Sequence, residues 1–144
     1  MRHQIALQVR WGDMDAYQHV NNVAYAAYLQ EARAHLLTTE LAGTAAEALL
    51  GTLVLARLKI SYLRPLVHTG AAIMAHSWFS ALTAATITVE CVLDDVSANP
   101  DGPYCRGTTV LAPFDFAAGR PTRVTPEQRA ALTAFYEPPL SPGS

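Results

Sequence analysis

A polar segment directly before a long apolar run constrains the fold of this chain more than any other feature. The segment places these residues within eleven positions: Gly12, Asp13, Asp15, His19, Asn21 and Asn22. In the run that follows, buried-type side chains recur at spacings of four, three and four: Tyr25, Leu29, Ala32 and Leu36. This period predicts a buried helix over residues 22–39.

The helix should begin where the polar segment ends. Asn21 or Asn22 can cap it, because a short side-chain oxygen accepts hydrogen bonds from the free amides of a first turn. The amides that the cap does not use point back toward Asp13 and Asp15. They can donate to an oxygen that becomes negative during a reaction.

Length and composition predict one domain. The chain has 144 residues, enough to bury a sizeable core, and we expect the domain to cover residues 1–136 with a flexible tail at 137–144. Apolar residues make up 51% of the chain and charged residues only 15%. So low a charged fraction suggests that part of the surface is covered, most simply by oligomerisation. The net charge of −2 gives no basis for nucleic-acid binding.

Several other classes are disfavoured by what the sequence contains. Arg2 and His3 precede an alternating run rather than an apolar signal segment, and no apolar stretch is long enough to span a bilayer, so we expect a cytoplasmic protein without membrane contact. Cys91 and Cys105 lack a Cys-x-x-Cys spacing, which favours two reduced thiols in a sheet. The histidines form no recognisable metal-ligand set, so we expect no metal.

Alternating and apolar segments predict about five strands. They cover residues 2–10, 53–63, 71–80, 84–93 and 104–116. A short helix is expected at 45–50, a loop at 94–103, and a C-terminal helix that starts at Pro126 with Thr125 as its cap. A helix as apolar as 22–39 must be enclosed, and an antiparallel sheet curled around it would do so.

The second predicted strand carries a basic edge. Its apolar face is expected to consist of Val54, Ala56, Leu58, Ile60 and Tyr62. Arg57 and Lys59 lie on the other face, and Arg64 follows the strand. Such cations can bind phosphate groups of a ligand, although a solvated strand face accounts for them equally well.

The run R-W-G-D-M-D-A-Y-Q-H-V-N-N-V-A-Y, residues 10–25, resembles hotdog-fold thioesterases of the 4-hydroxybenzoyl-CoA thioesterase type. It is also similar to the D-x-N-Q-H-V-N-N segment of plant acyl-ACP thioesterases, and K-I-S-Y-L-R-P-L at 59–66 continues the match. The resemblance implies an α+β hotdog fold, with an antiparallel sheet of about five strands wrapped around one long central helix.

The same resemblance implies a function. The protein would be an acyl-CoA or acyl-carrier-protein thioesterase that releases a free acid and a thiol. It would need no cofactor, since the coenzyme A thioester is the substrate, and it would act as a homodimer or homotetramer. The alternatives are a non-catalytic acyl-CoA-binding hotdog protein and a hotdog dehydratase or hydratase, for which we find no H-F-P-G-like motif.

Asp15 matches the catalytic carboxylate of the family, the second acid of its D-x-D pair. It would attack the thioester carbonyl or activate a water as general base; alternatively, it only accepts from loop amides. Asp13 matches a structural residue. His19 would orient Asp15, position water or donate to the leaving thiolate, or else bond the loop backbone. The amides near Asn22 and Val23 would form the oxyanion hole.

The resemblance is incomplete at three positions. Trp11 and Asn22 stand where one bacterial subgroup has tyrosine and histidine, and Tyr17 replaces the asparagine of the plant motif. Tyr17 and Trp11 would shape an acyl pocket or serve only in packing. Glu31 is an alternative base inside the helix, or a partner of His35 or of a neighbouring subunit.

Overall fold

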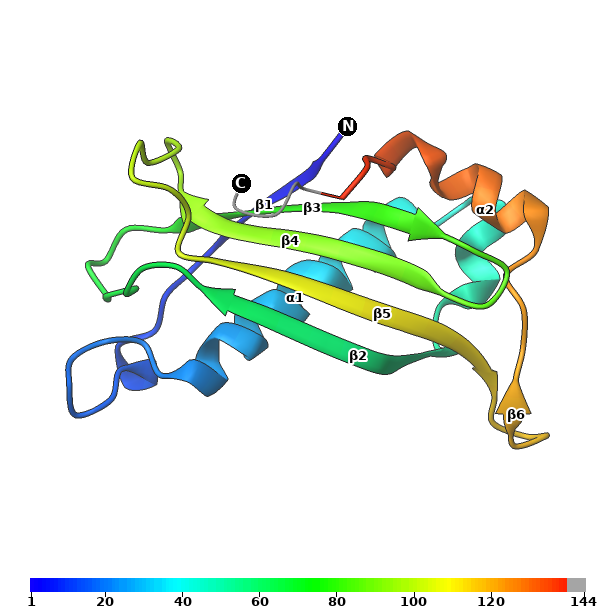
Figure 1. The fold of residues 1–144 in the computed structure, drawn as a ribbon, viewed down its shortest axis with the longest axis horizontal. Coiled ribbons are helices and arrows are strands. Elements are labelled where there is room, and N and C mark those ends of the chain that lie inside the picture. Colours follow the sequence, from blue (N-terminus) through cyan, green and yellow to red (C-terminus); the bar gives the residue numbers. More distant parts are fainter. Residues whose placement is uncertain (140–144) are drawn as a thin grey trace.

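One antiparallel sheet wraps around a central helix, α1 (Asn22–Glu40), in a computed structural model that describes residues 1–139 (Figure 1). The strands are β1 (His3–Leu7), β2 (Leu53–Tyr62), β3 (Ile73–Leu82), β4 (Ile87–Asp95), β5 (Cys105–Asp115) and β6 (Arg120–Pro121). The sheet order is β1-β3-β4-β5-β2, and the short β6 pairs with β5. The predicted α+β class and the wrapped helix are confirmed.

Shorter helices complete the described part of the chain. They are the 3-10 turns η1 (Trp11–Asp13), η2 (Ala45–Leu49) and η3 (Thr133–Phe135), and the α-helix α2 (Pro126–Leu132). Thr125 caps α2 and exchanges bonds with Gln128 in a capping box, and Pro126 stands at the first turn, as the sequence predicts. None of the helices within residues 1–139 is long and apolar enough to cross a membrane.

The central helix packs its predicted face against the concave side of the sheet. All four residues of the predicted stripe are buried: Tyr25, Leu29, Ala32 and Leu36. The approach is closest at Gly107 of β5, where an added Cβ would lie 2.7 Å from a methyl carbon of Leu29. The core falls into two clusters along α1, one around Tyr25 and Leu29 and the other around Leu36 and Phe79.

A β-bulge changes β2 from its predicted pattern. In β2 the register shifts between Leu55 and Arg57, so the alternation predicted for this strand holds only from Arg57 onward. Leu55 pairs with the buried Leu111 on the concave face, whereas Val54, predicted there, faces the other side. A bulge inserts one unpaired residue and inverts the alternation, which periodicity alone does not reveal.

The ends of the described chain are held together at the edge of β3. Arg2 forms an ion pair with Glu137 (Nε to Oε2, 2.7 Å) and stacks on the indole of Trp78, 3.8 Å from the ring centroid. The Glu137 amide also donates to the carbonyl of Phe79. Contacts with the domain therefore extend to Glu137, one residue beyond the predicted boundary at 136. Residues 140–144 of the predicted tail lie outside the described residues.

Candidate functional site

Asp15 and His19 are brought together by a small hairpin. Met14 and Val20 form an isolated antiparallel bridge, and inside it the Asp15 amide donates to the His19 carbonyl at 2.9 Å. The loop closes through a bond from the Gln18 amide to the Asp15 carbonyl at 3.0 Å, with Gln18 in the left-handed region at φ 61°. The sequence predicts a loop here. The structure shows that this loop is a small hairpin, with Asp15 and His19 opposite each other on its two arms.

Asn21 joins this hairpin to α1. Its side-chain oxygen caps the helix by accepting from the Ala24 amide at 2.9 Å, and its side-chain nitrogen donates to the Asp13 carbonyl at 2.8 Å. The cap uses the third amide of the helix, so the amides of Asn22 and Val23 have no partner among the described residues. Free first-turn amides attract negative charge, as the sequence predicts for this position.

Asp13 is built into the loop. Its carboxylate accepts from the Arg10 guanidinium at 3.0 and 3.1 Å and from the Tyr28 hydroxyl at 2.5 Å. These bonds, that from Arg10 foremost, hold the pKa of Asp13 below its ordinary value of 3.8. The geometry agrees with a structural role for Asp13.

The lowered pKa of Asp13 predicts how the free energy of unfolding depends on pH. A carboxyl whose pKa is lower in the folded state stabilises the protein above the unfolded pKa, and this stabilisation is lost as the pH falls through the folded value. Asp13→Asn should therefore lower the free energy of unfolding at pH 7, and the gap to wild type should narrow by about pH 3. Urea unfolding at both pH values measures this; a gap that is the same at both would contradict the ion pair.

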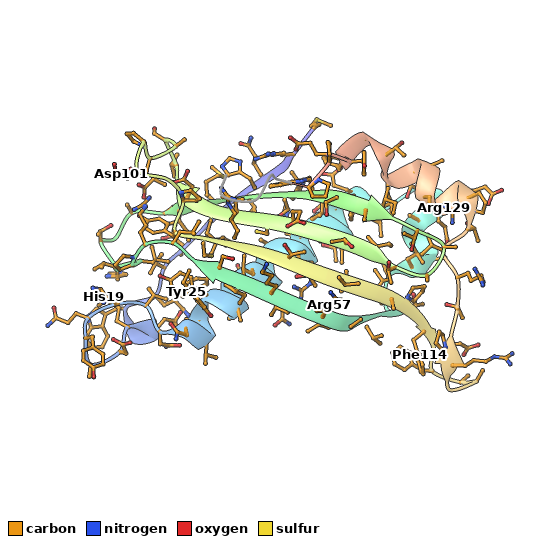
Figure 2. All side chains as sticks on the ribbon, viewed as in Figure 1. His19, Tyr25, Arg57, Asp101, Phe114 and Arg129 are labelled. Atoms are coloured by element: carbon orange, nitrogen blue, oxygen red, sulfur yellow. The ribbon has the colours of Figure 1, made fainter. Side chains whose placement is uncertain are left out.

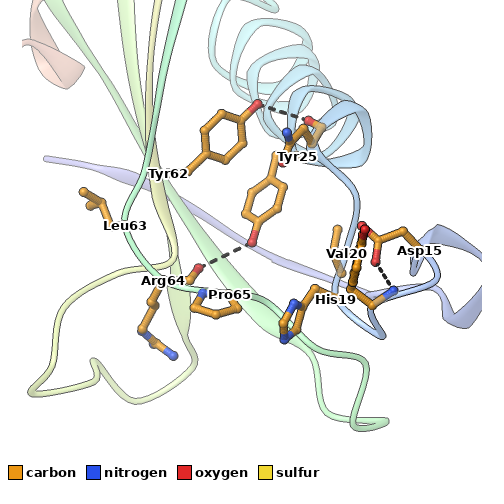
Figure 3. A pocket seen from close by; sticks show the side chains of 10 residues that line it. Asp15, His19, Val20, Tyr25, Tyr62, Leu63, Arg64 and Pro65 are labelled. Carbon is orange, nitrogen blue, oxygen red and sulfur yellow. Dashed lines mark hydrogen bonds between the residues drawn. The ribbon is translucent and has the colours of Figure 1, made fainter.

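A pocket of about 410 Å³ opens where the hairpin meets α1 (Figure 3). Five of its lining residues are among those predicted from the sequence: Asp15, Tyr17, His19, Asn22 and Arg64. The structure thus gathers both candidate catalytic side chains and the N-terminus of α1 around one cavity.

Other lining residues were not predicted for the site. Tyr25 comes from α1, and Tyr62, Leu63 and Pro65 come from the end of β2 and the segment after it. For Tyr62, Leu63 and Pro65 the sequence signal is the second matching run, K-I-S-Y-L-R-P-L, whose pattern predicts only a strand and a basic edge. The Tyr25 hydroxyl fixes this segment, because it accepts from the Leu66 amide at 2.9 Å.

The Asp15 carboxylate has both the loop contact and the exposure that its two candidate roles require. One oxygen, Oδ1, accepts from the Tyr17 amide at 2.9 Å, whereas no protein donor contacts Oδ2 among the described residues. The side chain is exposed at the pocket wall. The carboxylate can therefore satisfy a loop amide with one oxygen and present the other to a substrate or a water.

Trp11 and Val23 do not line this pocket. Trp11 is 73% exposed and lines a neighbouring hollow that it shares with Asp15 and Gln18. The Val23 side chain is 79% exposed, and Tyr17, although it lines the pocket, is 82% exposed. The packing alternative for Trp11 and Tyr17 has no support within the described chain, because neither ring is buried.

The three cations of the predicted basic edge do not lie together in the structure. The Arg64 guanidinium donates to the Gly102 carbonyl at 2.8 Å and to the carboxylates of Asp94 and Asp95 at 3.4 and 3.1 Å. Arg57 and Lys59 are exposed on β2 and do not line the pocket, and Figure 2 places Arg57 midway along the strand, away from His19.

The remaining titratable candidates lie apart from the pocket. Glu31 is exposed and lines a separate hollow beside Tyr28. His35 pairs with His3 (Nδ1 to Nε2, 2.7 Å) rather than with Glu31, because β1 brings His3 against α1. Among the described residues no group of three or more histidine, cysteine or acidic side chains is placed to hold a metal.

Both cysteines are free, buried thiols on the concave face. Burial raises the pKa of Cys91 to about 11 and that of Cys105 to about 12. Both thiols are therefore protonated near neutral pH, and neither lines the pocket, so neither is a candidate nucleophile.

Comparison with known proteins finds a matching family and several similar solved structures. A family model described as the thioesterase-like superfamily matches residues 9–132. A protein of Pseudomonas aeruginosa assigned as a putative thioesterase shares 34% identity over 90% of this chain and 96% of its own, with a TM-score of 0.73. A predicted thioesterase of Bacillus stearothermophilus has a TM-score of 0.81 at 15% identity, covering 97% of this chain and all of its own.

A third solved structure is that of a thioesterase from Thermus thermophilus complexed with coenzyme A and Zn. It shares 23% identity with this chain, covers 92% of each, and has a TM-score of 0.74. At 23% identity, and at the 15% of the Bacillus protein, the likeness shows a shared fold and nothing more specific.

Proposed function

This chain belongs to the thioesterase-like superfamily and has its hotdog fold, and from that premise we propose that it hydrolyses acyl-CoA thioesters to a free acid and coenzyme A. The observation that supports this most is the pocket that Asp15, His19 and the free N-terminus of α1 share. It combines a carboxylate, an imidazole and unpaired amides, which are the groups that acyl transfer requires.

Each group has a role in the proposed reaction. The amides of Asn22 and Val23 donate to the carbonyl oxygen as it becomes an oxyanion. Asp15 attacks the carbonyl carbon, or takes a proton from a water that attacks it; the C–S bond then breaks. The departing thiolate takes up a proton, and the imidazole of His19, which lines the same pocket, is the candidate donor. In the direct route, water hydrolyses the anhydride on Asp15.

Coenzyme A is the proposed carrier, with acyl-carrier protein as the alternative. The structural likeness to a thioesterase complexed with coenzyme A supports this choice. Arg57 and Lys59 remain candidates for its phosphates because their side chains are exposed. Arg64 is the weaker candidate, since Asp94, Asp95 and Gly102 already accept from its guanidinium.

We also propose that the protein works as a homodimer or a homotetramer. Among the described strands β2 ends the sheet with β5 as its only partner, and it leaves Leu55 and Leu58 exposed, 52% and 36% respectively. An unpaired edge with exposed leucines is suited to pairing with a second copy. Sedimentation equilibrium should give a mass of at least twice 15.5 kDa. A mass of one chain at all concentrations would refute this proposal.

Thiol release from a panel of acyl-CoAs tests the function. Short, long and aromatic acyl groups are offered to the wild-type protein, and free coenzyme A is followed with a thiol-reactive dye. Turnover of any member supports hydrolysis and identifies the acyl class. Tight binding of acyl-CoA without thiol release would instead favour the non-catalytic binding role, for which the departures at Trp11, Tyr17 and Asn22 are the sequence evidence.

A further inference from the structure

The phenol of Tyr62 connects the end of β2 to the first turn of α1. Its hydroxyl donates to the carbonyl oxygen of Asn22 at 3.2 Å, as the dashed line in Figure 3 marks. Its ring meets the ring of Tyr25 edge to face, with centroids 5.1 Å apart and planes at 89°. Tyr62 lines the pocket and is 48% exposed, so it borders the space that a substrate would occupy.

The bond to Asn22 acts on one particular peptide unit. The carbonyl of Asn22 and the N–H of Val23 belong to the same amide group, so a donor at the oxygen draws electron density away from the nitrogen. Hydrogen bonds polarise one another along such a chain, by an estimated 10–30% per bond. The Val23 N–H, free of any partner among the described residues, therefore becomes a stronger donor.

We propose that Tyr62 is a positioning residue that polarises and orients the Asn22–Val23 peptide for oxyanion binding. The inference rests on the proposed function, in which the Val23 amide is an oxyanion donor. Tyr25 stabilises this arrangement. Its ring packs edge to face against the Tyr62 ring, and its hydroxyl accepts a hydrogen bond from the Leu66 amide at 2.9 Å. A strand end and a helix end are thereby fixed to each other at the pocket.

The effect should fall on kcat rather than on KM. An amide that is a better donor gains most as negative charge develops on the carbonyl oxygen, which happens in the transition state and the tetrahedral intermediate but not in the bound thioester. Loss of a whole oxyanion donor lowers kcat by about 10²–10³-fold, and weakening one donor should lower it by roughly 10-fold. Substrate binding, which involves the neutral thioester, should change little.

Tyr62→Phe is the variant that tests this, with Tyr136→Phe as its control. Tyr136 also carries a half-exposed phenol, 46% against 48%, but lies beside α2, away from the pocket. We expect Tyr62→Phe to lower kcat about 10-fold with KM within about 3-fold of wild type. Tyr136→Phe should match wild type in both. An unchanged kcat in Tyr62→Phe, or a loss confined to KM, would overturn the proposal.

A readout that does not depend on activity tests the contact itself. The ¹⁵N chemical shift of an amide responds to a hydrogen bond at the carbonyl of its own peptide group. In Tyr62→Phe the Val23 ¹⁵N signal should therefore move, whereas in Tyr136→Phe it should stay. 3-Fluorotyrosine at position 62, a stronger donor, should shift it in the opposite direction and raise kcat. A Val23 signal that does not respond to either change would refute the contact.

The two readouts separate this inference from the proposed function. A wild-type protein that hydrolyses no member of the panel would refute the function and, with it, any catalytic contribution of Tyr62. The Val23 shift would still decide whether the hydroxyl polarises the peptide. An active wild type with a responsive Val23 shift but an undiminished kcat in Tyr62→Phe would refute the inference alone.

Discussion

Asp15→Asn should lower thioester hydrolysis by about 10³-fold while the protein stays folded. Among the described residues the carboxylate is the only acidic group lining the pocket, and one of its oxygens is free of protein donors. Asparagine keeps the size of the side chain but has neither the charge nor the basicity that attack on a thioester, or on a proton of water, requires. The loss should therefore appear in kcat.

This substitution also separates the two roles that the sequence left open for Asp15. The Oδ1 atom accepts from the Tyr17 amide at 2.9 Å, and the amide oxygen of an asparagine accepts the same bond. If Asp15 only satisfied the loop, Asp15→Asn would keep the hairpin and the activity together. Activity close to wild type in this variant would thus assign Asp15 to the loop and refute its catalytic role.

A matched control uses the neighbouring acid. Asp13→Asn removes a carboxylate of the same loop that pairs with Arg10 and Tyr28 and does not line the pocket. Its main effect should be on the free energy of unfolding. kcat from thiol release and the urea midpoint are measured for both variants. The expected pattern is a large loss of kcat at Asp15 and a loss of stability at Asp13, and the reverse pattern would exchange their roles.

The sequence predicted the part of the site that is contiguous in the chain. A helix of strict period, a capping asparagine and two acids just before it are local features, and local features determine how a loop meets a helix. Asp15, His19 and Asn22 accordingly lie on one pocket. The rest of the pocket is formed by Tyr62, Leu63 and Pro65, at and after the end of β2. The position of this end depends on how β2 pairs with β5, and a local sequence pattern does not determine that pairing.

The partners of Arg64 are another feature that the local sequence pattern does not predict. In the sequence it stands with Arg57 and Lys59 as a third cation of one edge. In the structure its guanidinium stacks on Tyr104, 3.7 Å from the ring centroid, and is paired with Asp94 and Asp95, which follow it in the chain by 30 and 31 positions. A strand pattern predicts which face a residue occupies but not which distant acid meets it.

Leu36→Ala should have the largest effect on stability, a loss of about 2–5 kcal/mol in the free energy of unfolding. The Leu36 side chain is 0% exposed and packs in the core cluster that contains Phe79 and Ile87. Truncation loses the transfer free energy of the removed carbons and leaves a cavity, because the surrounding structure relaxes only partly. Leu37→Ala, the same change at the next, partly buried position of α1, controls for helix propensity and should have a smaller effect.

The same variant tests whether the two ends of α1 are independent. Tyr25 and the pocket belong to the other core cluster, around Leu29, so the cavity at Leu36 should leave the catalytic geometry in place. Below its unfolding transition, Leu36→Ala should therefore show wild-type kcat and KM per folded molecule, while urea unfolding reports the lost stability. A fall in kcat without unfolding would mean that the helix transmits strain along its length to its N-terminal amides. The site would then depend on the whole core rather than on the hairpin, Tyr62 and the end of β2 that surround it.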